Sequence, residues 1–162
     1  MTNQKKDILT LLRKNARMSV QEIADRLRTQ PATVEEQIKE LERDGLILGY
    51  TAVVSSEAEQ DQVRAIIEVQ VQPEREAGFD NIARTLAKFP EVTAVHLVSG
   101  RYDLRLEVVG KSLQDVATFV ASRLACQNGV KSTATLFLLK KYKEAGIEFD
   151  KEEKYARLNI TP

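Results

Sequence analysis

The sequence predicts an α+β protein in which a helical unit precedes a unit of alternating strands and helices. Apolar residues first recur at helical spacing, a polar stretch without period follows at residues 55–63, and strand and helix patterns then alternate. We therefore divide the 162-residue chain into a first domain, a strand linker, a second domain and a charged C-terminal tail. Their predicted ranges are residues 1–50, 51–63, 64–143 and 144–162.

The first domain begins with the signals of two helices. An apolar stripe opens at Ile8, and a second stripe occupies positions i, i+3, i+4 and i+7 within residues 20–27. Ser19 and Glu22 form an S-x-x-E capping box in front of this second stripe. The second helix is therefore expected to begin near residue 20 and to end near residue 27.

A third helix follows after a turn of three residues, 28–30. Pro31 suits the first turn of a helix, and Gly45 suits a position just after its end. The apolar positions of the third helix are Val34, Ile38 and Leu41. Two helices joined by so short a turn have the layout of a helix-turn-helix. Residues 46–54 then change to an apolar, β-branched composition, which predicts a short extended wing.

The second domain is predicted to be a βαββαβ unit. Strand patterns alternate with apolar stripes at helical spacing, and a turn at residues 100–101 joins the two middle strands. The predicted strands cover residues 65–71, 92–99, 102–109 and 130–139, and the predicted helices cover residues 79–86 and 113–124. This order is typical of a ferredoxin-like domain.

One face of the predicted sheet needs a partner. Two helices can cover one face of a four-stranded antiparallel sheet, yet residues 136–139, Leu-Phe-Leu-Leu, make the last strand apolar toward both faces. The helix-turn-helix is mostly occupied with its own core. We therefore expect a second copy of the sheet to cover the free face, which gives an isologous homodimer.

Composition excludes several other classes of protein. The 24 Lys and Arg residues balance 24 Asp and Glu residues, so net charge gives no attraction to nucleic acid or membrane. One Cys and one His can form neither an internal disulfide nor a four-ligand zinc site from N and S donors. No apolar run approaches the length of a membrane span. We expect a cytoplasmic protein without metal, cofactor or membrane contact.

Taken in order, these motifs make the chain resemble the Lrp/AsnC family of transcriptional regulators over about residues 7–143. The motifs are Asp-Ile-Leu at 7–9, Met-Ser-Val-Gln-Glu-Ile-Ala at 18–24, the apolar pattern at 34–41, Asp-Gly-Leu-Ile-Leu-Gly-Tyr-Thr-Ala at 44–52, Pro-Glu-Val at 90–92 and Ser-Gly-Arg-Tyr-Asp at 99–103. The resemblance implies a winged helix-turn-helix that binds double-stranded operator DNA and a RAM-type ligand-sensing domain. It also implies homodimers that assemble into higher homo-oligomers and respond to amino acids or related metabolites.

The residues expected to contact DNA lie on the turn and on the third helix. We expect Arg28, Thr29 and the N-terminus of the third helix to bind phosphate. The residues expected to contact base edges are Thr33, Gln37 and Lys39. Acidic residues at positions 35, 36 and 40 repel phosphate, so each helix-turn-helix should bind weakly and several together should bind by avidity.

The resemblance assigns effector binding to the hairpin Gly100, Arg101, Tyr102 and Asp103. Relatives often carry an acid where Arg101 stands, and an arginine instead favours a carboxylate or phosphate. The alternative is that Arg101 forms a salt bridge with a neighbouring side chain. Further pocket candidates carried over from the family are Thr133 and Thr135. The expected effector is an amino acid or another carboxylate metabolite.

Other readings of the chain remain open. The first is a ligand-sensing or interaction protein whose DNA binding is weakened. The second is an enzyme, since sirohaem decarboxylases have a similar scaffold, but His96 lies mid-strand with no nucleophile placed beside it by a motif, and we expect no catalytic residues. Cys126 is expected to be buried and inert. The charged tail is either solvated or docked on a protomer.

Overall fold

The computed structural model describes residues 2–73 and 78–149. The chain divides into two compact units. The first ends at Val53 and also includes residues 143–148, and the second begins at Val54. Most of the predicted tail, residues 150–162, lies outside the described residues, so whether it is solvated or docked remains a prediction.

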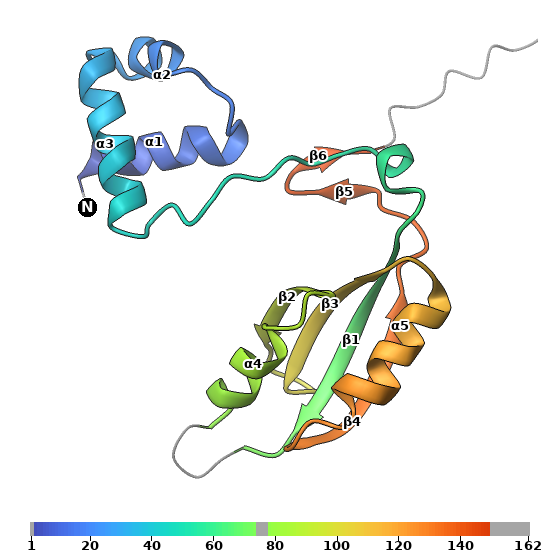
Figure 1. Cartoon of the computed structure of the whole chain (residues 1–162). Coiled ribbons are helices and arrows are strands. Elements are labelled where there is room, and N and C mark those ends of the chain that lie inside the picture. The colour runs from blue at the N-terminus through green and yellow to red at the C-terminus, as the bar shows by residue number, and fades with distance from the viewer. Residues whose placement is uncertain (1, 74–77, 150–162) are drawn as a thin grey trace, which may run out of the picture. The chain divides into compact units, whose positions relative to one another are not determined.

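The first unit contains three helices, α1 (Asn3–Lys14), α2 (Val20–Leu27) and α3 (Pro31–Arg43) (Figure 1). The Ser19 hydroxyl accepts a hydrogen bond from the backbone N–H of Glu22 at 3.1 Å, which caps α2 as predicted. The buried apolar side chains of this unit are Ile8, Leu12, Ile23, Ala24, Val34 and Leu41. They come from all three helices, so the helices form one small shared core.

The segment after α3 differs from the prediction. Residues 46–54 form no strand in the described chain, and Leu48 is 94% exposed. A strand is stable only when a neighbour completes its hydrogen bonds, and no described segment pairs with this one. The predicted strand linker also contains a short 3-10 helix, η1 (Ser56–Glu59), because its polar residues favour a turn over an extended backbone.

The start of the predicted tail forms a hairpin. Strands β5 (Lys143–Glu144) and β6 (Ile147–Glu148) pair antiparallel. Ala145 and Gly146 join them with φ of 48° and 84°, the left-handed backbone that a tight two-residue hairpin turn requires. Part of the tail is therefore ordered secondary structure.

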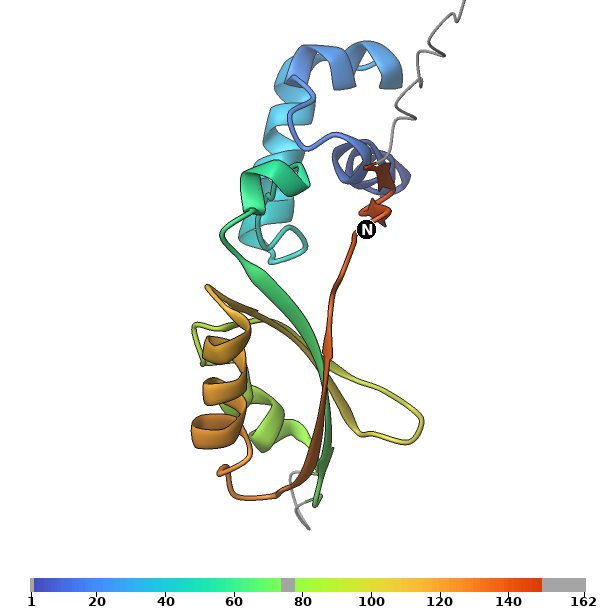
Figure 2. The same cartoon turned by 90° about the vertical axis from the view of Figure 1, so that its right-hand side faces the viewer.

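The second unit is a four-stranded antiparallel sheet with two helices on one side. Its strands are β1 (Val63–Val71), β2 (Val92–Leu97), β3 (Leu104–Gly110) and β4 (Val130–Phe137), in the spatial order β2-β3-β1-β4. Figure 2 shows both helices on the same side: α4 (Asp80–Leu86) and α5 (Leu113–Phe119), which continues into a π-helical turn, η2 (Val120–Leu124). The predicted α+β class and βαββαβ order are confirmed.

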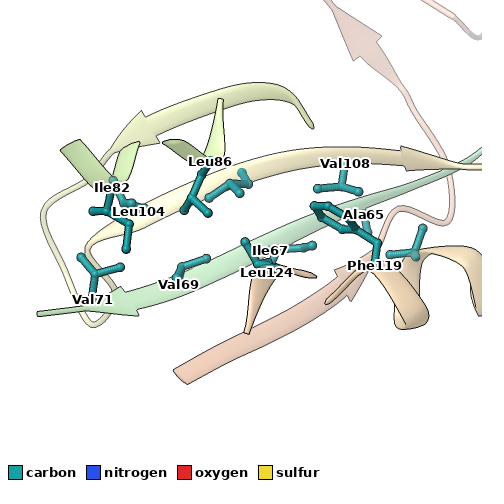
Figure 3. Close-up of a cluster of buried hydrophobic side chains, with 12 residues drawn as sticks. Ala65, Ile67, Val69, Val71, Ile82, Leu86, Leu104, Val108, Phe119 and Leu124 are labelled. Atoms are coloured by element: carbon teal, nitrogen blue, oxygen red, sulfur yellow. The ribbon is translucent and has the colours of Figure 1, made fainter. Parts of the chain in front are cut away.

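The core of this unit lies between the sheet and the helices (Figure 3). On β1, alternate residues point toward the helices, as the two-residue period of a strand requires. The buried side chains are Ala65, Ile67, Val69, Val71, Ile82, Leu86, Leu104, Leu106, Val108, Val116, Phe119 and Leu124. Beside them, the rings of Phe89 and Phe119 meet edge to face at 5.5 Å, which joins the end of α4 to α5.

The other face of the sheet carries no helix in the described chain (Figure 2). In register, Ile66 of β1 lies between Glu107 and Leu136 on this face. Leu136 on this face is 50% exposed, because no described segment of the same chain covers the apolar side of this strand. The strand ends at Phe137 rather than at residue 139, so its apolar run continues beyond the sheet.

Candidate DNA-binding surface and effector site

The turn of the helix-turn-helix is built around Arg28. This residue ends α2 with φ 52° and ψ 49°, a left-handed conformation that costs a non-glycine residue roughly 1–2 kcal/mol. The next N–H, that of Thr29, donates to the Ala24 carbonyl at 3.0 Å and closes the end of the helix. The Arg28 side chain is exposed, so the turn presents a guanidinium to solvent.

The N-terminus of α3 follows this turn directly. Pro31 occupies the first turn, and the cap residue Gln30 makes no hydrogen bond from its side chain to the helix. Pro31 has no N–H, and the Thr33 N–H donates to the Gln30 carbonyl at 3.1 Å, so in this first turn the Ala32 N–H is the group that can donate to a phosphate oxygen at the end of a 13-residue helix. Thr29 and Thr33 flank this end of the helix and are half-buried.

The predicted base-reading residues point in different directions. Gln37 is half-buried, and its amide nitrogen donates to the Oε1 of Gln4 on α1 at 2.8 Å. Lys39 is exposed, and its Nζ lies 2.7 Å from Glu35 Oε1. Sequence periodicity distinguishes the apolar face of α3 from its polar face, but it did not show which polar side chains would turn toward α1.

The exposed side of α3 is a stripe that sequence reasoning only partly identified. Its members at helical spacing are Ala32, Glu35, Glu36, Lys39 and Arg43. The Lys39 hydrogen bond and charge hold the pKa of Glu35 below its ordinary value. Glu40 pairs with Lys5 of α1 at 2.7 Å. Two of the three acidic residues expected to repel phosphate therefore have a cation beside them.

The predicted effector hairpin is tied to the end of β1 through Asp103. The Asp103 N–H donates to the Val69 carbonyl at 3.1 Å, and the Val71 N–H donates to Asp103 Oδ2 at 2.9 Å. The Val98 N–H also donates to the Asp103 carbonyl, at 2.9 Å, and closes the hairpin. Asp103 is thus already occupied with backbone groups, and its contacts fix where the hairpin lies.

The other predicted effector residues lie around the same end of β1. Arg101 is exposed, and its guanidinium lies 5.7 Å from the ring centre of Tyr102. Among the described residues no acidic side chain pairs with Arg101, and the salt-bridge alternative stays a prediction. Thr133 pairs with Val69 and Thr135 with Ile67 across β1 from the hairpin. Thr133 therefore lies nearer to Asp103 in register than Thr135 does.

Two residues for which no catalytic or reactive role was expected, His96 and Cys126, are exposed. His96 lies on β2 opposite Arg105. Cys126 is exposed rather than buried, and its thiol donates to the Ala121 carbonyl at 3.3 Å, because it lies beyond Leu124, the last buried residue of this helical segment. Among the described residues, no group of three His, Cys, Asp or Glu could hold a metal ion. No described helix has the length and apolarity needed to cross a bilayer.

A tight helix-turn-helix and a separate sensor-like sheet define the class of ligand-responsive DNA-binding regulators, and comparison with known proteins bears this out. The model of the winged helix-turn-helix DNA-binding family matches residues 1–47, and the model of the Lrp/AsnC ligand binding domain matches residues 64–147. The chain belongs to the Lrp/AsnC family. It is a DNA-binding transcriptional regulator with a metabolite-responsive domain.

Individual relatives agree with this assignment. The HTH-type transcriptional regulator YugG of Bacillus subtilis is 35% identical over 164 residues, which cover 100% of this chain and 99% of the relative. The HTH-type transcriptional regulator FL11 of Pyrococcus furiosus is 30% identical over 139 residues, covering 86% and 89%. The match to YugG extends along the whole chain and so includes its C-terminal segment.

Solved structures show the same architecture. The transcriptional regulator NMB0573 of Neisseria meningitidis, in complex with L-Met, is 26% identical, with a TM-score of 0.71 over 89% of this chain and 93% of that one. The leucine response regulatory protein of Mycobacterium tuberculosis is 19% identical, with a TM-score of 0.74 over 93% of this chain and 100% of that one. At 19% identity, the second likeness concerns the fold alone.

Proposed function

We propose that the protein binds operator DNA as a homodimer or higher homo-oligomer, and that a small carboxylate metabolite at the Gly100–Asp103 hairpin controls this binding. The observation that carries the proposal is the sheet face without a helix, next to a hairpin that is fixed to β1. We further propose that it acts in the cytoplasm and has no catalytic activity, which its likeness to named transcriptional regulators supports.

The free sheet face has the chemistry of an interface between two copies. Ile66 and Leu136, which are paired in register, provide its apolar surface. Glu68 lies opposite Arg105 in register, so the face carries both signs of charge. A surface with apolar and oppositely charged groups can be complementary to itself across a two-fold axis. Light scattering at micromolar concentration should give at least a dimer, and a monomer would contradict this part of the proposal.

DNA binding is assigned to the turn and α3. Arg28, Thr29 and the α3 N-terminus are proposed to hold phosphate, with Thr33, Gln37 and Lys39 at base edges. For the last two roles, Gln37 has to leave Gln4 and Lys39 has to leave Glu35. Both contacts would oppose binding, which supports weak sites that act together in an oligomer.

Effector binding is assigned to Arg101 and Tyr102, with Gly100, Thr133 and Thr135 as lining. The guanidinium of Arg101 can receive a carboxylate in a two-point hydrogen bond. The L-Met complex of the Neisseria relative supports an amino acid as the carboxylate. Asp103 is proposed to hold the hairpin in place rather than to touch the ligand, because its carboxylate already accepts from Val71.

A salt titration of DNA binding tests the assignment of the turn. We would measure fluorescence anisotropy of labelled DNA from the region upstream of the gene, with the wild type and Arg28→Gly. Glycine tolerates the left-handed backbone, so the variant removes the guanidinium without harming the turn. Each Arg28 that holds a phosphate should contribute about 1 to the slope of log K against log salt.

The outcomes of this titration are distinct. A lower slope for Arg28→Gly at unchanged sequence preference supports the phosphate role. An unchanged slope and affinity would remove Arg28 from the interface. No binding by the wild type at low salt would favour the alternative of a sensing protein with weakened DNA binding. The exposed Glu36 of α3, which pairs with no cation in the described chain, also favours that alternative.

A further inference from the structure

We propose a second small-molecule site, for a short-chain carboxylate, at the end of β1 that follows η1. The site is a cavity of about 240 Å³ between η1, the start of β1 and the chain that follows β4. The lining residues that carry the argument are Glu59, Arg64, Leu138, Leu139, Lys140 and Lys141. All of them belong to the second unit, so the cavity is complete within it.

This cavity is separate from the effector hairpin. Arg64 is the second residue of β1 and pairs with Val109 of β3. The hairpin is bonded instead to Val69 and Val71, near the other end of the strand. A ligand in the cavity therefore cannot be the one proposed at Arg101.

Charge in the cavity favours an anion. Three cationic side chains, those of Arg64, Lys140 and Lys141, line it with one carboxylate, that of Glu59. The Glu59 carboxylate already contacts two of these cations: its Oε1 accepts a hydrogen bond from Arg64, and its Oε2 lies 2.8 Å from Lys141 Nζ. The Glu59 and Lys141 side chains are each only 16% exposed, so solvent screens this cluster less than it screens a surface pair.

One hydrogen-bond donor of the Arg64 guanidinium has no partner in the described chain. Its Nη2 bonds to Glu59, but its Nε is buried and has no hydrogen-bond partner in the described chain. A buried N–H without a partner is costly, and a guanidinium can hold a second acceptor through its remaining N–H groups. A ligand oxygen placed in the cavity would satisfy Nε, and the net positive charge would favour that oxygen being anionic.

The apolar lining and the size of the cavity narrow the ligand to a small carboxylate with an aliphatic tail. Leu138 and Leu139 line the same space as the cations, which suits a molecule with one charged and one apolar end. Its volume lies below the roughly 300–1,000 Å³ of sites for drug-sized ligands, so the ligand is a metabolite of a few carbons. Phosphate shares the charge but has no tail to contact the leucines.

Binding would compete with the contact that holds η1. The bound carboxylate would share Arg64 and Lys141 with Glu59, which is the last residue of η1. The hydrogen bond from Lys141, followed by that from Arg64, already holds the pKa of Glu59 below its ordinary value, so this carboxylate stays charged and competes at neutral pH. Ligand binding should therefore loosen η1 and the connector before β1.

Calorimetric titration of the full-length protein with butyrate tests the proposal at constant ionic strength, with phosphate and chloride as comparison anions. Arg64→Gln should weaken butyrate binding about ten-fold or more, since it removes a charge-assisted hydrogen bond. Glu59→Gln should tighten it, because the built-in competitor loses its charge. Lys88→Gln, at an exposed position after α4, is the matched control and should leave butyrate binding unchanged. Arg101→Gln is measured beside it to identify any butyrate that binds at the effector hairpin.

Each outcome of this titration either supports or overturns the second site. Saturable butyrate binding that is stronger than phosphate binding, weakened by Arg64→Gln and strengthened by Glu59→Gln, supports the site. Absence of binding by both the wild type and Glu59→Gln overturns it, as does equal binding by Arg64→Gln. If Arg64→Gln does not fold, the opposite shift expected of Glu59→Gln still decides. Loss through Arg101→Gln alone would assign butyrate to the effector hairpin and overturn the second site, without touching the proposed function.

Discussion

The two units differ in how much apolar core holds them together. Among the described residues, the sheet unit buries twelve apolar side chains in one continuous cluster, whereas the helical unit buries six. The helical unit adds polar contacts between α1 and α3, Gln4 with Gln37 and Lys5 with Glu40. Since apolar burial supplies most folding free energy, the DNA-binding unit should be the one that unfolds first.

The largest expected effect on stability comes from truncating one buried side chain in the core of each unit. Ile23→Ala in the helical unit and Leu106→Ala in the sheet unit each remove a fully buried side chain, at a cost of about 2–5 kcal/mol. Ile23→Ala should abolish DNA binding, because the small core loses a large share of its apolar contacts, and should leave the proposed homodimer intact. Leu106→Ala should lower the melting temperature of the sheet unit and weaken the proposed homodimer.

Circular dichroism, DNA binding and light scattering together check this pair of variants. A matched control is Leu48→Ala, since this side chain is 94% exposed and its loss leaves the core unchanged. If Ile23→Ala also dissociated the dimer, the two units would not be independent in stability, and the contrast between them would fail.

A smaller effect on stability is expected from weakening the hydrogen bond that joins Asp103 of the hairpin to Val71 of β1. Asp103→Asn keeps the size of the side chain but weakens its acceptance from the Val71 N–H, a loss of about 1–2 kcal/mol. Amide hydrogen exchange at Val71 should become faster, and affinity for an amino-acid effector should fall. Unchanged exchange at Val71 together with lost effector affinity would instead make Asp103 a direct ligand contact.

The charge cluster at η1 predicts a dependence of stability on pH. The pKa of Glu59 lies below its ordinary 4.5, chiefly through the hydrogen bond from Lys141 and then that from Arg64. A lowered folded pKa means that the stabilisation is complete above the unfolded pKa and disappears as pH falls through the folded pKa. The difference in urea midpoint between wild type and Glu59→Gln should therefore be constant above about pH 5 and shrink at lower pH. A difference that stays constant at low pH would contradict this assignment.

The smallest effect is expected on the exposed side of α3. Glu36→Gln removes a carboxylate that, unlike Glu35 and Glu40, has no cation paired with it in the described chain. Stability should change by less than about 0.5 kcal/mol, because the position is exposed. DNA affinity at low salt should rise equally for all sequences. Glu57→Gln, an exposed position outside the helical unit, is the control, and a change in sequence preference would instead make Glu36 a reader of bases.

Much of the fold was predictable because it depends on local spacing. The capping box at Ser19 and the apolar period placed α2 at residues 20–27, where the structure has it. Alternation along β1 and the short turns of the second domain identified the βαββαβ order. The candidate DNA-binding turn was predictable for the same reason, since three residues between two helices leave few geometries.

Other features depended on groups far apart in the chain. Gln37 meets Gln4 across 33 positions, and Lys141 meets Glu59 across 82. No local period contains such pairs. The same limit explains why the predicted extended wing forms no strand in the described chain, which offers it no partner. It also explains why Cys126 was expected to be buried although it follows the last buried turn.

The amino-acid sequence alone determined which helices and strands form and in what order, which family the chain belongs to, and that one sheet face is apolar. It could do so because apolar periodicity, helix caps and turn residues depend on only a few neighbouring positions. The packing of elements decided which polar side chains of α3 turn inward, how Asp103 fastens the hairpin and where Arg64 keeps a buried donor. These outcomes depend on distances between elements, which arise only once the two cores have formed.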